Sequence, residues 1–184
     1  PWPDRRPGRQ RGSLFPSVFN FFAGNRVLSS LIKRLTGFAE KRSIPLLYMV
    51  TLRKWMKRNM VSLNPANPIG TICLFVDEFT NFNDTTTGIA AVRLLTSLGY
   101  RIRTIDHGVS ARTFISKGMI RKARNVIRKN IEVFADVISE DMPLVGIEPS
   151  AILGFRDEYP ELAGDDMKEK AEKIAANSWF IDEF

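Results

Sequence analysis

Hydrophobic positions along the chain first follow a helical spacing and later a strand-like one. Five apolar side chains of residues 28–39 fall on one face at helical spacing, which predicts an amphipathic helix. They are Leu28, Leu31, Ile32, Leu35 and Phe38. Residues 51–60 predict a second short helix. Two prolines within residues 63–68 oppose helix formation, so we predict the main domain boundary near Asn67.

Beyond this boundary, short apolar runs alternate with helical patterns. The run at 71–76 is nearly continuous, which is typical of a strand buried on both faces. The other predicted elements are a helix that Asp84 caps and Gly99 ends, a strand at 100–105, one long helix at 113–138 and a strand at 143–147. This order predicts an α/β fold with an open, mainly parallel sheet in a three-layer αβα arrangement.

The predicted organisation is therefore an α/β domain at residues 68–184 behind a basic N-terminal extension with short helices at residues 1–67. Residues 1–27 are rich in Arg, Pro and Phe without clean periodicity, so we expect them to lie over another part of a larger protein. The chain starts at Pro1 and ends with bulky apolar residues, Trp179, Phe180, Ile181 and Phe184. We interpret it as a C-terminal piece of a longer chain.

Charge is distributed unevenly along the chain, although the total is only +7. Residues 1–70 contain 13 Lys and Arg against two acidic residues, whereas residues 140–184 contain 4 basic and 12 acidic residues. The basic cluster Arg53, Lys54, Lys57 and Arg58 is either a phosphate-tracking surface or the solvated face of a short helix. Because the acidic end would repel a polyanion, a nucleic-acid partner is disfavoured.

Composition also limits the cellular locations and the cofactor sites that we expect for this chain. No apolar run approaches the roughly 18 residues that span a bilayer, and no signal-peptide core follows the N-terminus. We expect a cytoplasmic protein, with a position peripheral to the inner membrane as an alternative, because Phe15, Phe19, Phe21 and Phe22 lie close to basic residues. Cys73 and His107 are the only residues of their types, so they cannot form a disulfide, a zinc site or a four-thiolate cluster site.

Polar side chains follow each of the three predicted strands. Open parallel sheets bind ligands in the crevice at the carboxyl ends of their strands, so these side chains define a candidate ligand crevice. It comprises Asp77, Asn81, His107, Ser110, Arg112, Lys117, Glu148 and Ser150. His107 could exchange protons beside Asp106 or Glu148, or act as a structural hydrogen-bonder. The stretch from Ser110 to Gly118 offers Arg112, Ser116 and Lys117 as anion contacts but is no P-loop, because Gly118 follows Lys117.

Several motifs occur together in an order that resembles a known module. They are Leu74–Phe82 (LFVDEFTNF), Gly88–Leu95 (GIAAVRLL), Leu98–Tyr100 (LGY), Arg112–Gly118 (RTFISKG), Gly146–Ser150 (GIEPS) and Arg156–Pro160 (RDEYP). About residues 15–184 resemble the C-terminal cysteine-rich (CCG-type) domain of FAD-linked, iron–sulfur 2-hydroxy-acid dehydrogenases. The same domain type occurs in glycolate oxidase iron–sulfur subunits and in the B subunit of heterodisulfide reductase.

The resemblance implies that an FAD domain of the parent chain oxidises a 2-hydroxy acid and passes electrons to upstream iron–sulfur clusters. It would place a Cys-Cys-Gly motif at Val109, Ser110 and Ala111 and a further cysteine near Ala151, and none of these cysteines is present. We therefore expect no cofactor in this chain itself. FAD and iron–sulfur clusters would belong to the parent chain.

The predicted role is a structural or electron-transfer-docking module whose own cluster ligands have been lost. Its partners would be the upstream FAD and iron–sulfur domains of the same chain, with an electron-acceptor protein or a membrane surface as further possibilities. Two other hypotheses stay open: a stand-alone α/β domain that binds a small molecule or an anion, and a basic nucleic-acid-binding module.

Overall fold

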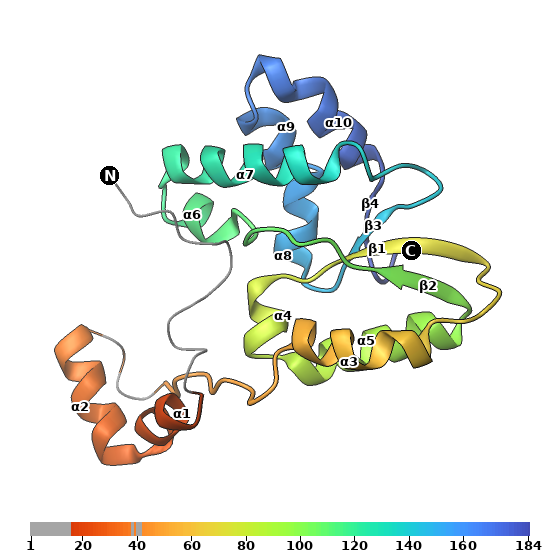
Figure 1. The fold of residues 1–184 in the computed structure, drawn as a ribbon. Helices are drawn as coiled ribbons and strands as arrows, with labels where there is room; N and C mark the ends of the chain where they lie inside the picture. Colours follow the sequence, from red (N-terminus) through yellow and green to blue (C-terminus); the bar gives the residue numbers. More distant parts are fainter. Residues whose placement is uncertain (1–15, 38, 40–41) are drawn as a thin grey trace.

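The computed structural model describes residues 16–37, 39 and 42–184, and its centre is a parallel β-sheet (Figure 1). In this described part of the chain, four strands pair in the order β2-β1-β3-β4. The strands are β1 (Gly70–Phe75), β2 (Tyr100–Arg103), β3 (Leu144–Gly146) and β4 (Ser178–Phe180). All three pairings are parallel, and the register places Cys73 of β1 beside Leu144 of β3. The predicted parallel sheet is confirmed.

Helices cover both faces of this sheet, as the two buried clusters of apolar side chains show. On one face, α3 (Leu52–Leu63) and α5 (Thr85–Ser97) pack against the sheet. On the other face, α7 (Ile120–Phe134) and α10 (Lys168–Ala176) lie across it, as Figure 1 shows. Strand β1 contributes Ile72 and Leu74 to the first cluster and Cys73 and Phe75 to the second, because successive strand side chains point to opposite faces. The αβα layering is therefore confirmed.

Shorter helices complete the two layers. They are α4 (Glu78–Phe82), α6 (Arg112–Ser116), α8 (Pro149–Ile152) and α9 (Glu158–Leu162), with 3₁₀ turns at Leu153–Phe155 and Asp165–Met167. Of these helices, α4 packs beside α3 and α5, and the other three contribute to the opposite cluster. Helix α4 begins where β1 ends, and Asp77 caps it by accepting hydrogen bonds from the backbone N–H groups of Phe79 and Thr80. Glu78, Arg112 and Ser150 thus lie on α4, α6 and α8, the helices that come next after β1, β2 and β3.

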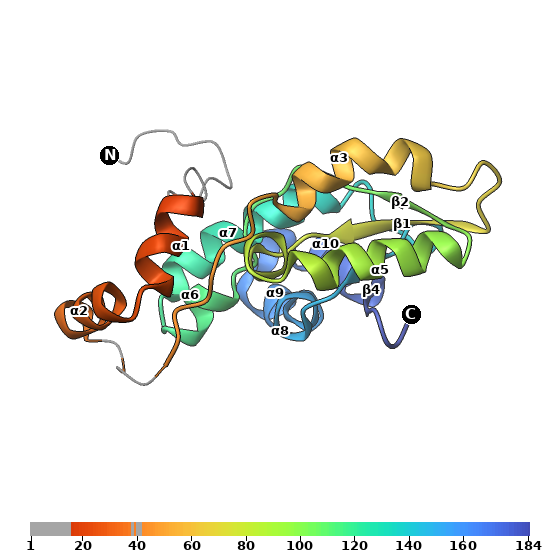
Figure 2. The same ribbon diagram turned by 90° about the horizontal axis from the view of Figure 1, so that it is seen from below.

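The N-terminal part of the described chain forms two helices apart from the sheet, α1 (Pro16–Gly24) and α2 (Arg26–Thr36), as both views show (Figure 2). Asn25 caps α2, and Gly37 ends it at a positive φ of 75°. The predicted helix at 28–39 is therefore confirmed but ends earlier, and Phe38 lies outside the described residues. The following segment contacts the α/β unit through the backbone N–H of Tyr48, which donates to the carbonyl of Phe82.

The prediction of one long helix is wrong, and several helices and one strand of the structure were not predicted. The long helix expected at 113–138 is divided into α6 and α7, because Gly118 adopts a φ of 66°, which a continuing helix cannot contain. Strand β4 and helices α9 and α10 were not predicted. Trp179 and Phe180, which the pattern indicated as an apolar chain end, instead pair as strand residues with Val145 and Gly146.

Candidate functional site

The strand order places a switch point between β1 and β3. The chain leaves β1 to form β2 on one side, and then returns past β1 to form β3 on its other side. Open α/β sheets place ligands in the crevice outside the carboxyl ends of the strands at such a point. Here that crevice lies beyond Phe75 and Gly146, where α4 and α8 begin.

Arg112 is the centre of the polar network in this crevice. Its side chain leaves the first residue of α6 and lies between two glutamates that follow β1 and β3. Its Nη1 is 3.3 Å from Oε2 of Glu148, and its Nε is 3.8 Å from Oε1 of Glu78. The side chain of Glu78 is only 12% exposed and that of Glu148 only 21%. The guanidinium therefore neutralises carboxylates that water solvates poorly.

Two serines complete this network. Ser110 donates to Glu78 twice, from its backbone N–H at 2.9 Å and from its Oγ at 2.8 Å. Ser150 accepts from Nη1 of Arg112 at 2.8 Å and donates to Glu148. The structure therefore brings together Ser110, Arg112, Glu148 and Ser150 of the predicted crevice, and adds Glu78 to them.

Glu78 was not among the predicted crevice residues, although it follows Asp77 at the end of β1. A signal for it existed, because Glu78 is a second carboxylate within three residues of the end of β1, close to where Glu148 follows β3. What the sequence did not contain was the strand order that makes these two glutamates neighbours of one arginine. The function of Glu78 in the network therefore became visible only in the fold.

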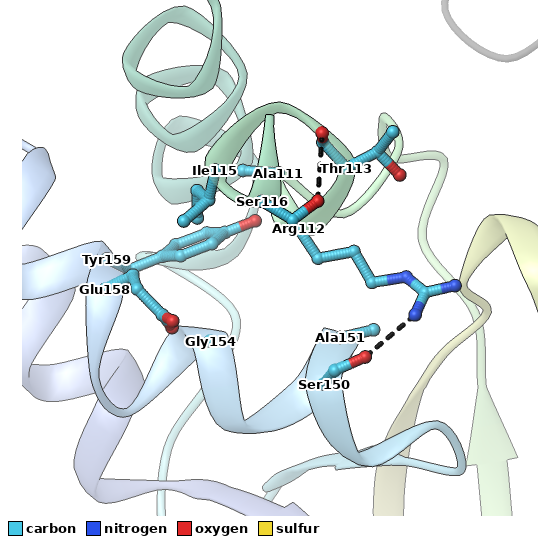
Figure 3. A pocket seen from close by; sticks show the side chains of 10 residues that line it. All are labelled: Ala111, Arg112, Thr113, Ile115, Ser116, Ser150, Ala151, Gly154, Glu158 and Tyr159. Carbon is cyan, nitrogen blue, oxygen red and sulfur yellow. Dashed lines mark hydrogen bonds between the residues drawn. The ribbon is translucent and has the colours of Figure 1, made fainter. Parts of the chain in front are cut away.

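A pocket of about 400 Å³ opens beside this network (Figure 3). Its lining consists of Ala111, Arg112, Thr113, Ile115, Ser116, Ser150, Ala151, Gly154, Glu158 and Tyr159. The side chains of Arg112 and Ser150 meet on one side and the ring of Tyr159 lies on the other, as Figure 3 shows. Since Glu78 and Glu148 already balance Arg112 and Glu158 adds a further carboxylate, the pocket offers no excess positive charge to an anion.

His107 is buried on the inner side of the crevice and makes structural hydrogen bonds. Its ring stacks on Phe75 with 4.3 Å between ring centroids. Its Nδ1 donates to the carbonyl of Gly108 at 2.6 Å, so its Nε2 accepts from Nη2 of Arg53 at 2.7 Å and from the N–H of Val76 at 3.3 Å. Burial and the positive charge of Arg53 lower its pKa from 6.5 to about 3, which keeps the imidazole neutral near pH 7.

The remaining predicted crevice residues lie outside the network around Arg112. Asp77 is buried as the cap of α4, and burial raises the pKa of its carboxyl group. Asn81 accepts from the backbone N–H of Arg53 and so joins α4 to α3. Lys117 is exposed after α6, and it is not among the residues that line the pocket. Asp106, the suggested partner of His107, pairs instead with Arg53.

The donors at this site do not fit an iron–sulfur cluster. The resemblance implies cysteines at Val109, at Ser110 and near Ala151, of which Ala151 lines the pocket and Ser110 is bonded to Glu78 beside it. They offer methyl groups and a hydroxyl, whereas clusters need thiolates. Cys73 lies in the buried core of the sheet, and burial raises the pKa of its thiol to about 12. Among the described residues, no group of three or more His, Cys, Asp and Glu side chains could hold a metal ion.

Comparisons with known proteins link the chain to segments of larger dehydrogenases. It is 26% identical over 173 residues to the D-2-hydroxyglutarate dehydrogenase of Escherichia coli strain K12, which covers 89% of this chain and 17% of that protein. The D-2-hydroxyglutarate dehydrogenase of Pantoea ananatis is 25% identical over 159 residues, 82% of this chain and 15% of that protein. The C subunit of the anaerobic glycerol-3-phosphate dehydrogenase of E. coli K12 is 22% identical over 159 residues, 84% of this chain and 39% of that protein.

The chain thus spans about a sixth of the D-2-hydroxyglutarate dehydrogenases that it matches. No family model matches the chain, and no solved structure matches it. The predicted relationship to oxidoreductases is confirmed at this level: the chain is homologous to one segment of larger dehydrogenases. Among the described residues, no helix is both long enough and apolar enough to cross a membrane.

Proposed function

We propose that this chain is the C-terminal module of an FAD- and iron–sulfur-dependent oxidoreductase that acts on a 2-hydroxy acid. Its role is to shape the electron-transfer assembly or to dock the electron acceptor, and it holds no cluster of its own. The supporting observation is that Ser110, beside the switch-point pocket, and Ala151, in its lining, lie at the same end of the sheet. These are positions at which the resemblance implies cluster ligands, and an arginine held by two glutamates now lies beside them.

The similarity to dehydrogenase segments supports the same proposal. Where 15% to 17% of a D-2-hydroxyglutarate dehydrogenase matches most of this chain, the oxidation chemistry has ample room elsewhere in the protein. Nothing in the crevice requires this module to react with substrate, because His107 is neutral and fully hydrogen-bonded and Arg112 is charge-balanced. In this proposal the residues of this chain position the neighbouring parts of the assembly, and they transfer no protons.

The first test is to read the coding frame upstream of Pro1 and to purify the full chain that it specifies. We expect an FAD-binding domain followed by a Cys-x2-Cys-x2-Cys-x3-Cys-Pro run, and a purified chain that contains flavin and iron. A frame without a cysteine-rich segment, giving protein without flavin, would overturn the proposal.

A second test uses the full chain to separate substrate oxidation from electron delivery. In Arg112→Ala, we expect iron content and the rate of flavin reduction by D-2-hydroxy acid to match wild type, while turnover with the acceptor falls several-fold. Lys117→Ala, an exposed cation outside the pocket, is the matched control and should leave both rates unchanged. Loss of iron in Arg112→Ala would instead place a cluster in this module.

A further inference from the structure

Helix α2 presents apolar side chains to solvent. Val27, Leu31 and Leu35 are 77%, 56% and 78% exposed. Residues four apart lie on the same side of a helix, so these three form one continuous stripe along α2. On the same helix Lys33 is buried. Of the apolar face that the sequence predicted, Leu31 and Leu35 thus face solvent, whereas Leu28 and Ile32 are half-buried.

Helix α1 adds to this exposed apolar surface. It packs beside α2 and leaves Val18, Phe21 and Phe22 exposed, with the two phenyl rings edge to face. We call these three side chains together with Val27, Leu31 and Leu35 the hairpin surface. Single exposed apolar side chains are ordinary, but six within 18 residues mark a surface that another element covers. Both views place the hairpin away from the sheet, so the α/β unit does not cover it (Figures 1 and 2).

We propose that the hairpin surface docks onto the preceding, cluster-bearing part of the same longer chain. This inference rests on the proposed function, in which such a part exists. The matched segments are 17% and 39% of two relatives, so a chain of their length holds far more protein than these residues. In sequence, α1 and α2 are the first described elements and so the nearest ones to a preceding part of the chain.

The charge of the sequence segment that contains the hairpin surface indicates the chemistry of its partner. Residues 1–70 carry 13 basic residues and two acidic ones, so the apolar stripe belongs to a strongly basic part of the chain. Apolar interface cores with charged rims pair with surfaces of complementary charge. The docking partner is accordingly an apolar patch with an acidic rim. The sequence placed the basic side of this extension against an upstream domain, whereas the structure assigns the central contact to the apolar stripe.

Amide hydrogen exchange of the full chain and of the 184-residue chain measures this docking directly. Buried amides exchange more slowly because exchange then requires the interface to open. We expect exchange over residues 27–35 to be about tenfold slower in the full chain, which corresponds to about 1.4 kcal/mol of added protection. Exchange over α5 serves as the internal reference and should be equal in both chains.

The double variant Leu31→Asp with Leu35→Asp tests the surface itself. In the 184-residue chain these side chains face solvent, so the variant should unfold at the wild-type urea concentration. In the full chain it should abolish the added protection over 27–35. Val61→Asp is the matched control, because Val61 is 94% exposed on α3 and should change neither chain.

Three outcomes would overturn the docking proposal. The first is equal exchange over 27–35 in the two chains, and the second is protection that appears only with vesicles of anionic phospholipid. The third is concentration-dependent protection of the 184-residue chain, which would make a second copy the partner. Flavin and iron content of the full chain report on the proposed function separately, so protected exchange in a chain without cofactors would uphold docking and reject the enzyme class.

Discussion

Arg112 controls the charge balance of the crevice, because one guanidinium serves two poorly solvated carboxylates. Removing it in Arg112→Ala leaves Glu78 and Glu148 without a cationic partner, although Ser110 still donates to Glu78. We expect a loss of about 1–3 kcal/mol in the free energy of unfolding, measured by urea denaturation. Arg156→Ala, which breaks a more exposed pair with Glu183, should cost less than about 1 kcal/mol. Equal losses in the two variants would contradict the importance of the crevice network.

The free energy of unfolding should decrease as the pH is lowered, because His107 takes up a proton when the chain unfolds. Its pKa is 6.5 in the unfolded chain and about 3 in the folded one, so between these values the unfolded chain binds more protons. The stabilisation is present above pH 6.5 and is lost as the pH falls toward 3, with a slope of up to about 1.4 kcal/mol per pH unit. Asp77, whose folded pKa is raised by burial, offsets part of this loss at the acid end.

The measurement for His107 is urea denaturation at a series of pH values. The variant His107→Gln lacks the titrating ring, so we expect lower stability at pH 7 but a flatter dependence on pH below 6.5. If the variant and the wild-type chain lose stability with the same slope, another group controls the acid sensitivity.

At the scale of elements, the close approach of β3 and α8 fixes the position of the pocket wall. A Cβ atom built on Gly146 would lie 2.4 Å from Cβ of Ile152, which no folded protein tolerates without a shift. Gly146→Ala should therefore displace α8 with Ser150 and destabilise the fold by about 1–3 kcal/mol. Gly24→Ala, where nothing lies within 4 Å of the new Cβ, should leave the urea midpoint nearly unchanged. Similar midpoints for both variants would show that α8 adjusts freely.

Patterns among neighbouring residues predicted those helices and strands whose formation their own residues largely determine. The apolar run at 71–76 became β1 because both faces of that strand are covered by helices, and the helix from Asp84 became α5. The break at Gly118 escaped prediction because a glycine within a helical pattern is often tolerated and only its positive φ reveals the end of α6. Strand β4 has three residues and depends on pairing with β3, a distant contact that no local pattern contains.

The sequence predicted where the candidate site lies, but not which of its side chains form hydrogen bonds and ion pairs with one another. Polar residues after three strands located the crevice, because the carboxyl ends of parallel strands share one edge. The separation of Asp77 and His107 from the network around Arg112 follows from burial. Asp77 caps α4 and His107 stacks under Phe75, and neither role is visible in a sequence. Pairing of Arg112 with Glu78 and Glu148 required the strand order.

At the scale of the whole molecule, α3 connects the N-terminal region to the α/β core. Leu52 and Met56 of this helix are 0% and 2% exposed and pack in the same cluster as Ile72 and Val92. Arg53 also bonds to His107 across the crevice. The domain boundary near Asn67 stays a prediction, and the packing of α3 shows how to test it, because a chain that begins there lacks part of this cluster.

Two shortened chains, residues 43–184 and residues 68–184, provide that test. The longer one keeps α3, and we expect a cooperative urea transition close to that of the 184-residue chain. The shorter one loses Leu52 and Met56, each of which contributes about 2–5 kcal/mol when it fills a core. Because a whole domain is stable by only about 5–15 kcal/mol, residues 68–184 alone should show no cooperative transition by near-ultraviolet circular dichroism. A cooperative transition with an unchanged midpoint would place the boundary at Asn67 and make α3 part of the extension.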